Sequence, residues 1–375
     1  MSRISRPASR IIRFSNVGCL VATLALLTSA LAVATPAQAS SARAGKDGLE
    51  APFAVASDGT HVWVVNNNGP TPAYIGSVTE LHASTGALVK DIVAPSYQFN
   101  NPSAITSDGT HVWVVNSIGW VTELRASTGA LVKVIKGSRY QFNYPNAIAS
   151  DGTHVWVANA PGGGGGGEGP GWVTELRAST GALIKVIKGD GINAPDAIAS
   201  DGTHVWVANE WTGTVTELRA STGALVKFIK GSIFQLNLPV AMASDGTHVW
   251  VANQPCVFDD IFKCSNNLGN SITELRASTG TLVKVIKGSS YRFNNPSAIA
   301  SDRTHVWVVN SNNSVTQLLT STGALVKVIR GSKYGFNTSD TAAVASDGTH
   351  VWVANYNGNS VTELLASTGA LVRVI

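Results

Sequence analysis

Apolar residues in this chain gather in short segments between polar turns and lack the period of helices. The segments "NAIAS", "HVWVAN", "VTELRA" and "ALIKVI", from residues 146–187, are rich in the valine, isoleucine and threonine that favour β-strands. Ser-Asp-Gly-Thr separates the first two segments, and Asp-Gly is a strong signal for a tight hairpin. Ser-Thr-Gly separates the last two. The pattern predicts four antiparallel strands, which we call a, b, c and d.

This four-strand unit recurs along the chain at intervals of 43 to 57 residues. Each copy carries a tryptophan in strand b: Trp63, Trp113, Trp156, Trp206, Trp250, Trp307 and Trp352. Strand b reads "VWVV" or "VWVA", so we expect neighbours on both of its faces. Repeats of four strands and about 45 residues are typical of propeller blades. The sequence therefore predicts an all-β, seven-bladed β-propeller over residues 52–375, with four-stranded antiparallel blades and no strand exchanged where the ring closes.

The first 39 residues differ from the repeats. A basic start that contains four arginines precedes the apolar run "GCLVATLALLTSALAVA" and the small-residue end "AQA". This order predicts a cleaved signal peptide over residues 1–39, a connecting segment over 40–51 and a secreted or extracytoplasmic protein. An uncleaved membrane anchor is the alternative. After cleavage we expect no membrane span.

Charge changes the expected partners. The chain has 27 basic and 23 acidic residues, and four of the basic residues lie in the predicted signal, so the remainder is close to neutral. No basic stripe favours nucleic acid, and none is expected as a partner. We expect a monomer.

Two cysteines remain after the signal, Cys256 and Cys264, both within one insertion. In an oxidising compartment they predict a local disulfide. A metal pair is the alternative, although no histidine lies near them.

The motif "AIASDGTHVWVAN" followed by "VTELRASTGALVKVI" resembles the YVTN/NHL-type repeats of seven-bladed propellers. It is similar, more loosely, to secreted YncE-like proteins and to the propeller lyase that opens streptogramin B antibiotics. The resemblance covers roughly residues 52–375 and implies the fold more specifically than the function. The lyase would imply a histidine and acid pair with Mg²⁺ on one face, which cannot be assigned to particular residues here.

The blades differ mainly in the loops between strands b and c. We expect these loops and the d–a connectors to share one face of the disc, called the loop face, where repeat folds usually bind ligands. Candidate ligand-binding residues there are Trp120, Trp172, Trp211, Glu210, Asp259 and Asp260. The alternatives are that the tryptophans cap the blades and that the acids are solvated, although the Asp-Asp pair could bind Ca²⁺.

The d–a connectors repeat "YQFN" or a close variant, and we expect each Tyr-x-Phe to wedge between neighbouring blades. The third connector, "GDGINAP", lacks these aromatics, which predicts a gap beside blade 4. Arg303 replaces the turn glycine in blade 6, at a cost of about 1 kcal/mol if that position needs a positive φ.

One histidine opens strand b in every unit: His61, His111, His154, His204, His248, His305 and His350. Stacked sheets lie about 10 Å apart, whereas zinc ligands lie about 2 Å from the metal. The ring therefore cannot converge on one ion, and we predict a structural role in which each imidazole bonds turn backbone or a neighbouring blade. The repeated glutamate of strand c is expected to pair with the lysine or arginine of strand d.

Catalysis needs one asymmetric site, and neither G-x-S-x-G nor H-E-x-x-H occurs. We therefore predict a binding or scaffold module that recognises a protein, peptide or glycan through the loop face. A propeller lyase or hydrolase is the first alternative, and a cell-surface adhesion or assembly module is the second. No cofactor is predicted, and Ca²⁺ or Mg²⁺ at the propeller mouth stays an alternative.

Overall fold

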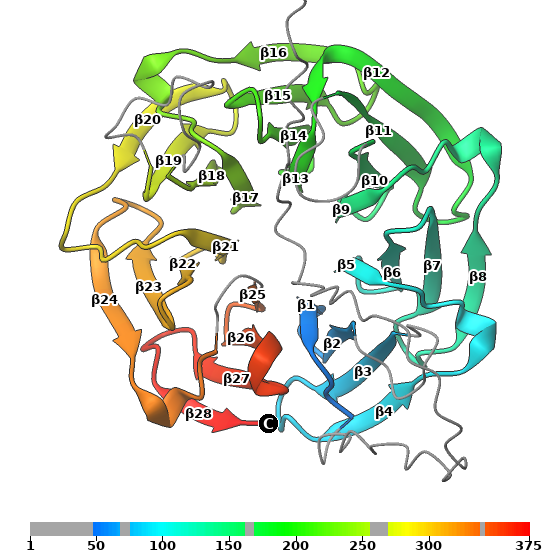
Figure 1. Ribbon diagram of the computed structural model, residues 1–375, viewed down its shortest axis with the longest axis horizontal. Coiled ribbons are helices and arrows are strands. Elements are labelled where there is room, and N and C mark those ends of the chain that lie inside the picture. Colours follow the sequence, from blue (N-terminus) through cyan, green and yellow to red (C-terminus); the bar gives the residue numbers. More distant parts are fainter. Residues whose placement is uncertain (1–47, 68–75, 162–168, 256–268, 338–341) are drawn as a thin grey trace, which may run out of the picture.

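The computed structural model is a ring of seven four-stranded antiparallel sheets (Figure 1). The structure describes residues 48–67, 76–161, 169–255, 269–337 and 342–375. The strands of each sheet are consecutive in the chain, so every blade is built from one repeat and no strand is exchanged. The prediction of an all-β seven-bladed propeller is confirmed.

The strands occupy equivalent places in every blade. The innermost strands a are β1 (Pro52–Ser57), β5 (Pro102–Ser107), β9 (Pro145–Ser150), β13 (Pro195–Ser200), β17 (Pro239–Ser244), β21 (Pro296–Ser301) and β25 (Ala342–Ser346). Strands b are β2 (His61–Asn66), β6 (His111–Asn116), β10 (His154–Asn159), β14 (His204–Asn209), β18 (His248–Asn253), β22 (His305–Asn310) and β26 (His350–Asn355). Strands c are β3 (Ser77–His82), β7 (Trp120–Arg125), β11 (Pro170–Arg177), β15 (Thr214–Arg219), β19 (Ser271–Arg276), β23 (Ser314–Leu319) and β27 (Ser360–Leu365). The outer strands d are β4 (Leu88–Ile92), β8 (Leu131–Ile135), β12 (Leu183–Asn193), β16 (Leu225–Ile229), β20 (Thr281–Ile286), β24 (Leu325–Arg330) and β28 (Leu371–Val374).

Short 3-10 turns lie in the loop-face connections of the described chain. They are η1 (Pro95–Tyr97), η2 (Ser138–Tyr140), η3 (Ser232–Phe234), η4 (Ser332–Tyr334) and η5 (Tyr356–Gly358).

The core lies between adjacent blades. Trp63 and Val65 of β2 pack in one cluster with Val112 and Val114 of β6 in blade 2. The alternate residues of the same strand, Val62 and Val64, pack on the other side in a cluster that contains Trp352 of blade 7. Because successive side chains of a strand point to opposite faces, a strand between two blades must be apolar on both. This explains the unbroken apolar run of strand b, whose repeated tryptophans are fully buried.

The ring closes between blades 7 and 1 through a segment that precedes β1. Leu49 is almost fully buried in the cluster that contains Trp352 and Val361 of blade 7. The backbone N–H of Ala51 donates to Asn359 Oδ1 at 2.8 Å. Blade 1 is thus fastened to blade 7 by an apolar side chain and a hydrogen bond as well as by the packing of β1 against β25.

The connectors between blades are packed as their aromatics predicted. Tyr97 and Phe99 stack with ring centroids 5.6 Å apart, and Phe99 lies in the cluster shared by blades 1 and 2. The predicted gap at the third connector is wrong. Ile192 is buried in the cluster shared by blades 3 and 4, and the Phe228 ring packs so closely on Gly191 that a Cβ there would lie 2.4 Å from it. One apolar residue and one aromatic from blade 4 fill the space.

The a–b turn is held by its aspartate. In blade 3, Asp151 Oδ1 accepts hydrogen bonds from the N–H groups of Thr153 and His154, at 2.7 and 2.6 Å. Gly152 adopts φ 84° in this turn, which only glycine adopts without strain. In blade 6, Asp302 Oδ1 accepts the same two hydrogen bonds, from the N–H groups of Thr304 and His305. Arg303 does not lie in the left-handed region, so the turn is rebuilt at this one residue and the expected strain is absent.

Candidate binding site on the loop face

Several predicted site residues lie outside the described part of the chain. These are Asp259 and Asp260 of the fifth b–c loop, together with the cysteines Cys256 and Cys264. The described residues of the loop face include Trp120, Trp172, Trp211 and Glu210.

Trp120 is the first residue of β7 in blade 2, and Trp172 is the third residue of β11 in blade 3. Both bond the connectors beside them. The Trp120 indole N–H donates to the carbonyl of Gln98 at 2.8 Å, and that of Trp172 donates to the carbonyl of Gln141 at the same distance. The ammonium of Lys188 lies 4.8 Å from the centre of the Trp172 ring. Both indoles are half-buried, and each bonds the connector that leads into its own blade, as the alternative of a capping role would require.

The residues that follow the first proline of strand a form a second set, which the sequence interpretation missed. We call it the inner ring, because strands a are innermost in Figure 1. Its described members are Phe53, Ser103, Asn146, Asp196, Val240 and Ser297. All are half-buried. The sequence contains a signal that could have identified these residues. The second position of strand a varies from blade to blade, as in "PNAIAS", "PDAIAS" and "PVAMAS", whereas the rest of the strand largely repeats.

An acid pair lies on blade 4 where the inner ring meets the b–c loop. Asp196 is the inner-ring residue of β13, and Glu210 follows directly after β14. The N–H of Glu210 donates to the carbonyl of Ala194 at 3.2 Å, which brings the start of the loop back beside β13. Burial raises the pKa of Asp196, and the negative charge of Glu210 raises it further. Burial also raises the pKa of Glu210. Two carboxyl groups that resist simultaneous ionisation can share a proton or accept a cationic partner.

Asn146 extends the acid pair to blade 3, and Ser297 is a further polar member of the inner ring in blade 6. Asn146 Nδ2 donates to Asp196 Oδ1 at 3.3 Å and to the carbonyl of Pro195 at 2.9 Å. Its Oδ1 is buried and has no hydrogen-bond partner among the described residues, and the same holds for Ser297 Oγ of blade 6. Strand-b indole nitrogens and strand-c carboxylate oxygens also lack partners in several blades of the described chain, but these two atoms lie on the inner ring, where a water or a ligand group can reach them.

The opposite side of the inner ring is aromatic. Phe53 of blade 1 and Tyr356 of blade 7 pack edge to face, with ring centroids 6.1 Å apart. Blades 1 and 7 lie across the ring from blades 3 and 4 in Figure 1. The inner ring is therefore asymmetric, with hydrogen-bonding and acidic groups on one side and rings on the other.

The seven repeated histidines lie on the opposite face of the disc, beside the a–b turns. In blade 3, His154 Nδ1 lies 3.3 Å from Asp151 Oδ2 and its Nε2 lies 3.9 Å from Glu175 Oε1. Histidine lies between an aspartate and a glutamate in the same way in blades 1, 2, 4, 5 and 7. The expected partners were turn backbone or a neighbouring blade, whereas the structure gives two carboxylates of the same blade.

The strand-c glutamates are buried, and this changes how they meet strand d. Glu123 pairs with Lys133 at 3.6 Å and Glu363 pairs with Arg373 at 2.7 Å, as predicted. Elsewhere the strand-d lysine reaches the next blade: Lys227 Nζ donates to the carbonyl of Thr279 at 3.1 Å. Buried carboxylates thus have histidine as their recurring neighbour, and the lysines link blades.

Within the described ranges, no set of three or more histidine, cysteine, aspartate or glutamate side chains is placed to hold a metal ion. In the same part of the chain, no helix has the length and hydrophobicity needed to cross a bilayer.

No protein-family profile and no curated protein matches this chain. Among solved structures, the hydrazine synthase of Kuenenia stuttgartiensis matches with a TM-score of 0.63 and 18% identity, over 85% of this chain and 97% of that one. The WD40 domain of Neurospora crassa Pan2 matches with a TM-score of 0.59 and 10% identity, over 82% and 86%. A computationally designed protein, Ika8, matches with a TM-score of 0.58 and 17% identity, over 88% of both chains. These similarities establish the propeller fold and leave the function to the site itself.

Proposed function

We propose that this protein is a binding or scaffold module that contacts its ligand through the inner ring and the b–c loops of the loop face. The observation that carries the proposal is the Asp196–Glu210 pair beside Asn146, whose Oδ1 is buried without a partner. The sevenfold repetition of the blades is broken at this position, and a ligand needs such an asymmetric site.

The chemistry of the pair indicates the ligand class. Two adjacent carboxyl groups and an amide oxygen accept hydrogen bonds and attract positive charge. The ligand group is accordingly an amine or guanidinium, as on a basic peptide, or a set of sugar hydroxyls. The ring pair of Phe53 and Tyr356 offers an apolar surface to a ligand that spans the ring.

The basic and apolar leader supports secretion of this module, with residues 1–39 removed as a signal peptide. The repeat motif supports membership of the YVTN/NHL-type propellers. The candidate disulfide Cys256–Cys264 belongs to the same proposal.

A lyase or hydrolase at the same position is the alternative. The raised pKa of Asp196 supports it, because a carboxyl that keeps its proton can act as a general acid. One variant distinguishes the two functions. If the protein is an enzyme, Asp196→Asn abolishes turnover and keeps substrate binding, whereas in a binding module the same variant weakens ligand binding.

The experiment is a ligand screen on the protein, by thermal shift and calorimetry, with lysine- and arginine-rich peptides, neutral glycans, Ca²⁺ and Mg²⁺. A ligand of the proposed site loses affinity in Asp196→Asn and Glu210→Gln and keeps it in Asp190→Asn, which removes an exposed acid from a loop-face connector. Equal loss in all three variants, or retention in all three, would show that the acid pair is not the binding site.

A further inference from the structure

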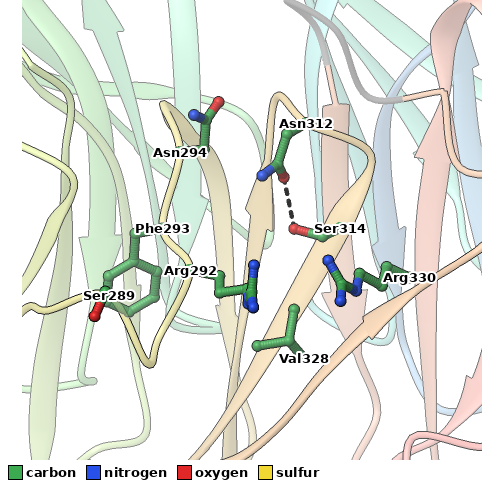
Figure 2. Close-up of a pocket in the computed structure, with 8 residues that line it drawn as sticks. All are labelled: Ser289, Arg292, Phe293, Asn294, Asn312, Ser314, Val328 and Arg330. Atoms are coloured by element: carbon green, nitrogen blue, oxygen red, sulfur yellow. Dashed lines mark hydrogen bonds between the residues drawn. The ribbon is translucent and has the colours of Figure 1, made fainter.

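A hollow of about 330 Å³ lies on blade 6, away from the inner ring. The connector into blade 6 contributes Arg292, Phe293 and Asn294 to its wall, and strand d contributes Val328 and Arg330. Figure 2 shows the two guanidinium groups on either side of Val328. Neither has a hydrogen bond or ion pair within the described residues, and both side chains are exposed. We call this hollow the arginine notch.

In blades 2 and 5 the equivalent cation has a hydrogen-bond acceptor. In blade 2, Lys136 at the end of strand d donates to Gln98 Oε1 of the connector at 3.0 Å. In blade 5, Lys287 donates to Gln235 Oε1 at the same distance. Blade 6 keeps the strand-d cation as Arg330 and replaces the connector glutamine by Arg292. An acceptor has become a second cation, and the interaction has changed from a hydrogen bond to like-charge repulsion.

Space at the notch comes from a small residue on strand c. The residue that pairs with the last asparagine of strand b is Trp120 in blade 2 and Trp172 in blade 3, where the indole N–H bonds the connector. Blade 6 has the small Ser314 at this position, as blades 1, 5 and 7 also have serine, so the space is shared with those blades and the second arginine is what distinguishes blade 6. The Ser314 hydroxyl donates to Asn312 Oδ1 at 2.6 Å, which leaves the Asn312 amide nitrogen as a donor at the edge of the notch (Figure 2).

We propose that the arginine notch binds an oxyanion, the phosphate, sulfate or carboxylate group of a ligand, between Arg292 and Arg330. Guanidinium groups match the oxygens of these anions with two parallel N–H donors each and are weakly hydrated. An anion placed between them replaces their mutual repulsion with attraction. The notch is built from strands c and d and a connector, so it is independent of the Asp196–Glu210 pair and of the function proposed for it.

The test measures binding of inorganic phosphate, sulfate and acetate to the whole protein at low ionic strength, by calorimetry and ³¹P NMR. We expect saturable binding that weakens with added NaCl, and about a tenfold or greater loss of affinity in Arg292→Gln and in Arg330→Gln. Glutamine is the residue of blades 2, 3 and 5 at the Arg292 position and adopts the same positive φ there, so the first variant is expected to fold. Preferential binding of the tetrahedral anions assigns the notch to phosphate or sulfate groups, and preferential binding of acetate assigns it to carboxylates.

Arg177→Gln is the matched control, because it removes an exposed arginine from the end of strand c on the other face of the disc. Gln235→Arg is the converse variant. It places an arginine opposite Lys287 in blade 5 and is expected to create a second anion site. Absence of saturable binding in the wild type, or equal weakening in Arg177→Gln, would overturn the proposal. Asp196→Asn should leave anion binding unchanged, which separates this result from that of the inner-ring proposal.

Discussion

Asn146 of blade 3 and Asp196 of blade 4 are 50 residues apart and meet across the junction of two blades, with Asn146 Nδ2 donating to Asp196 Oδ1 at 3.3 Å. The hydrogen bond favours the ionised carboxyl and opposes the rise in the pKa of Asp196 that burial and Glu210 cause. It therefore contributes, after burial and Glu210, to how much of the acid pair is charged at a given pH.

Asn146→Ser, which places the residue of blades 2 and 6 at this position, removes that hydrogen bond. We expect the pKa of Asp196 to rise further, so that its negative charge develops at a higher pH and cation binding shifts upward with it. A carboxyl titration by NMR, with Asp196→Asn to assign the signal, measures the midpoint. An unchanged or lower midpoint would contradict the role of Asn146.

Glu175→Gln tests the buried acids through the pH dependence of stability. Burial raises the pKa of Glu175 above its ordinary 4.5, so the unfolded chain releases this proton at a lower pH than the folded protein does. The contribution of Glu175 to the free energy of unfolding is fully present below about pH 4.5. It is lost as the pH rises through the pKa that Glu175 has in the folded protein. The glutamine of the variant does not titrate, so the variant does not lose this stability. The difference in thermal midpoint, variant minus wild type, should therefore increase as the pH rises from 4 to 7.

Blade 6 provides the natural precedent for that variant. Gln317 stands where the other blades have glutamate, and its Nε2 donates to the carbonyl of Ala366 in blade 7 at 3.3 Å. A constant difference between variant and wild type at every pH would show that Glu175 keeps its ordinary titration.

Gly202→Ala should destabilise the protein by about 1 kcal/mol. Gly202 has φ 86°, and a Cβ built there meets nothing within 4 Å, so the cost is that of the backbone conformation alone. Arg303→Ala at the equivalent position of blade 6 should be nearly neutral, because Arg303 does not have a positive φ. Thermal unfolding of the two variants tests the contrast, and equal losses would refute the rebuilt turn.

Gly191→Ala should destabilise in two ways: its φ of 74° is unfavourable for alanine, and Phe228 Cε2 would lie 2.4 Å from the new Cβ. Overpacking of this kind costs about 1–3 kcal/mol. Phe228→Val, which restores the residue of most other blades, should relieve part of that loss in the double variant. Additive losses measured by chemical denaturation would argue that the ring does not fill the third connector.

Leu49→Ala should weaken the closure of the ring. The side chain is 1% exposed in the cluster that joins blades 7 and 1. Removal of such a leucine costs about 2–5 kcal/mol. Hydrogen exchange should accelerate first in β1 and β26, which flank the closure, and uniform acceleration across all blades would contradict a local fastening.

The repeated pattern made the fold predictable, whereas the site depended on single deviations from that pattern. Val62–Val65 reads as a strand covered on both faces, and Asp-Gly and Ser-Thr-Gly turns separate the strands, so the blade follows from local preferences. Asp196 did not stand out in the sequence, because one acid in one strand acquires meaning only beside Asn146 and Glu210. Trp120 and Trp172 stood out as irregular, yet they bond their own connectors.

The sequence by itself determined the secondary structure, the number of blades and the loop face, because these follow from residues close together in the chain and repeated many times. Tertiary structure decided which irregular residues act together. Packing brought Phe228 of blade 4 onto Gly191 at the end of β12 and set Arg292 of the connector opposite Arg330 of β24. These contacts join different strands, and in the first case different blades, so their distances depend on how strands and blades pack and are not encoded in the repeat.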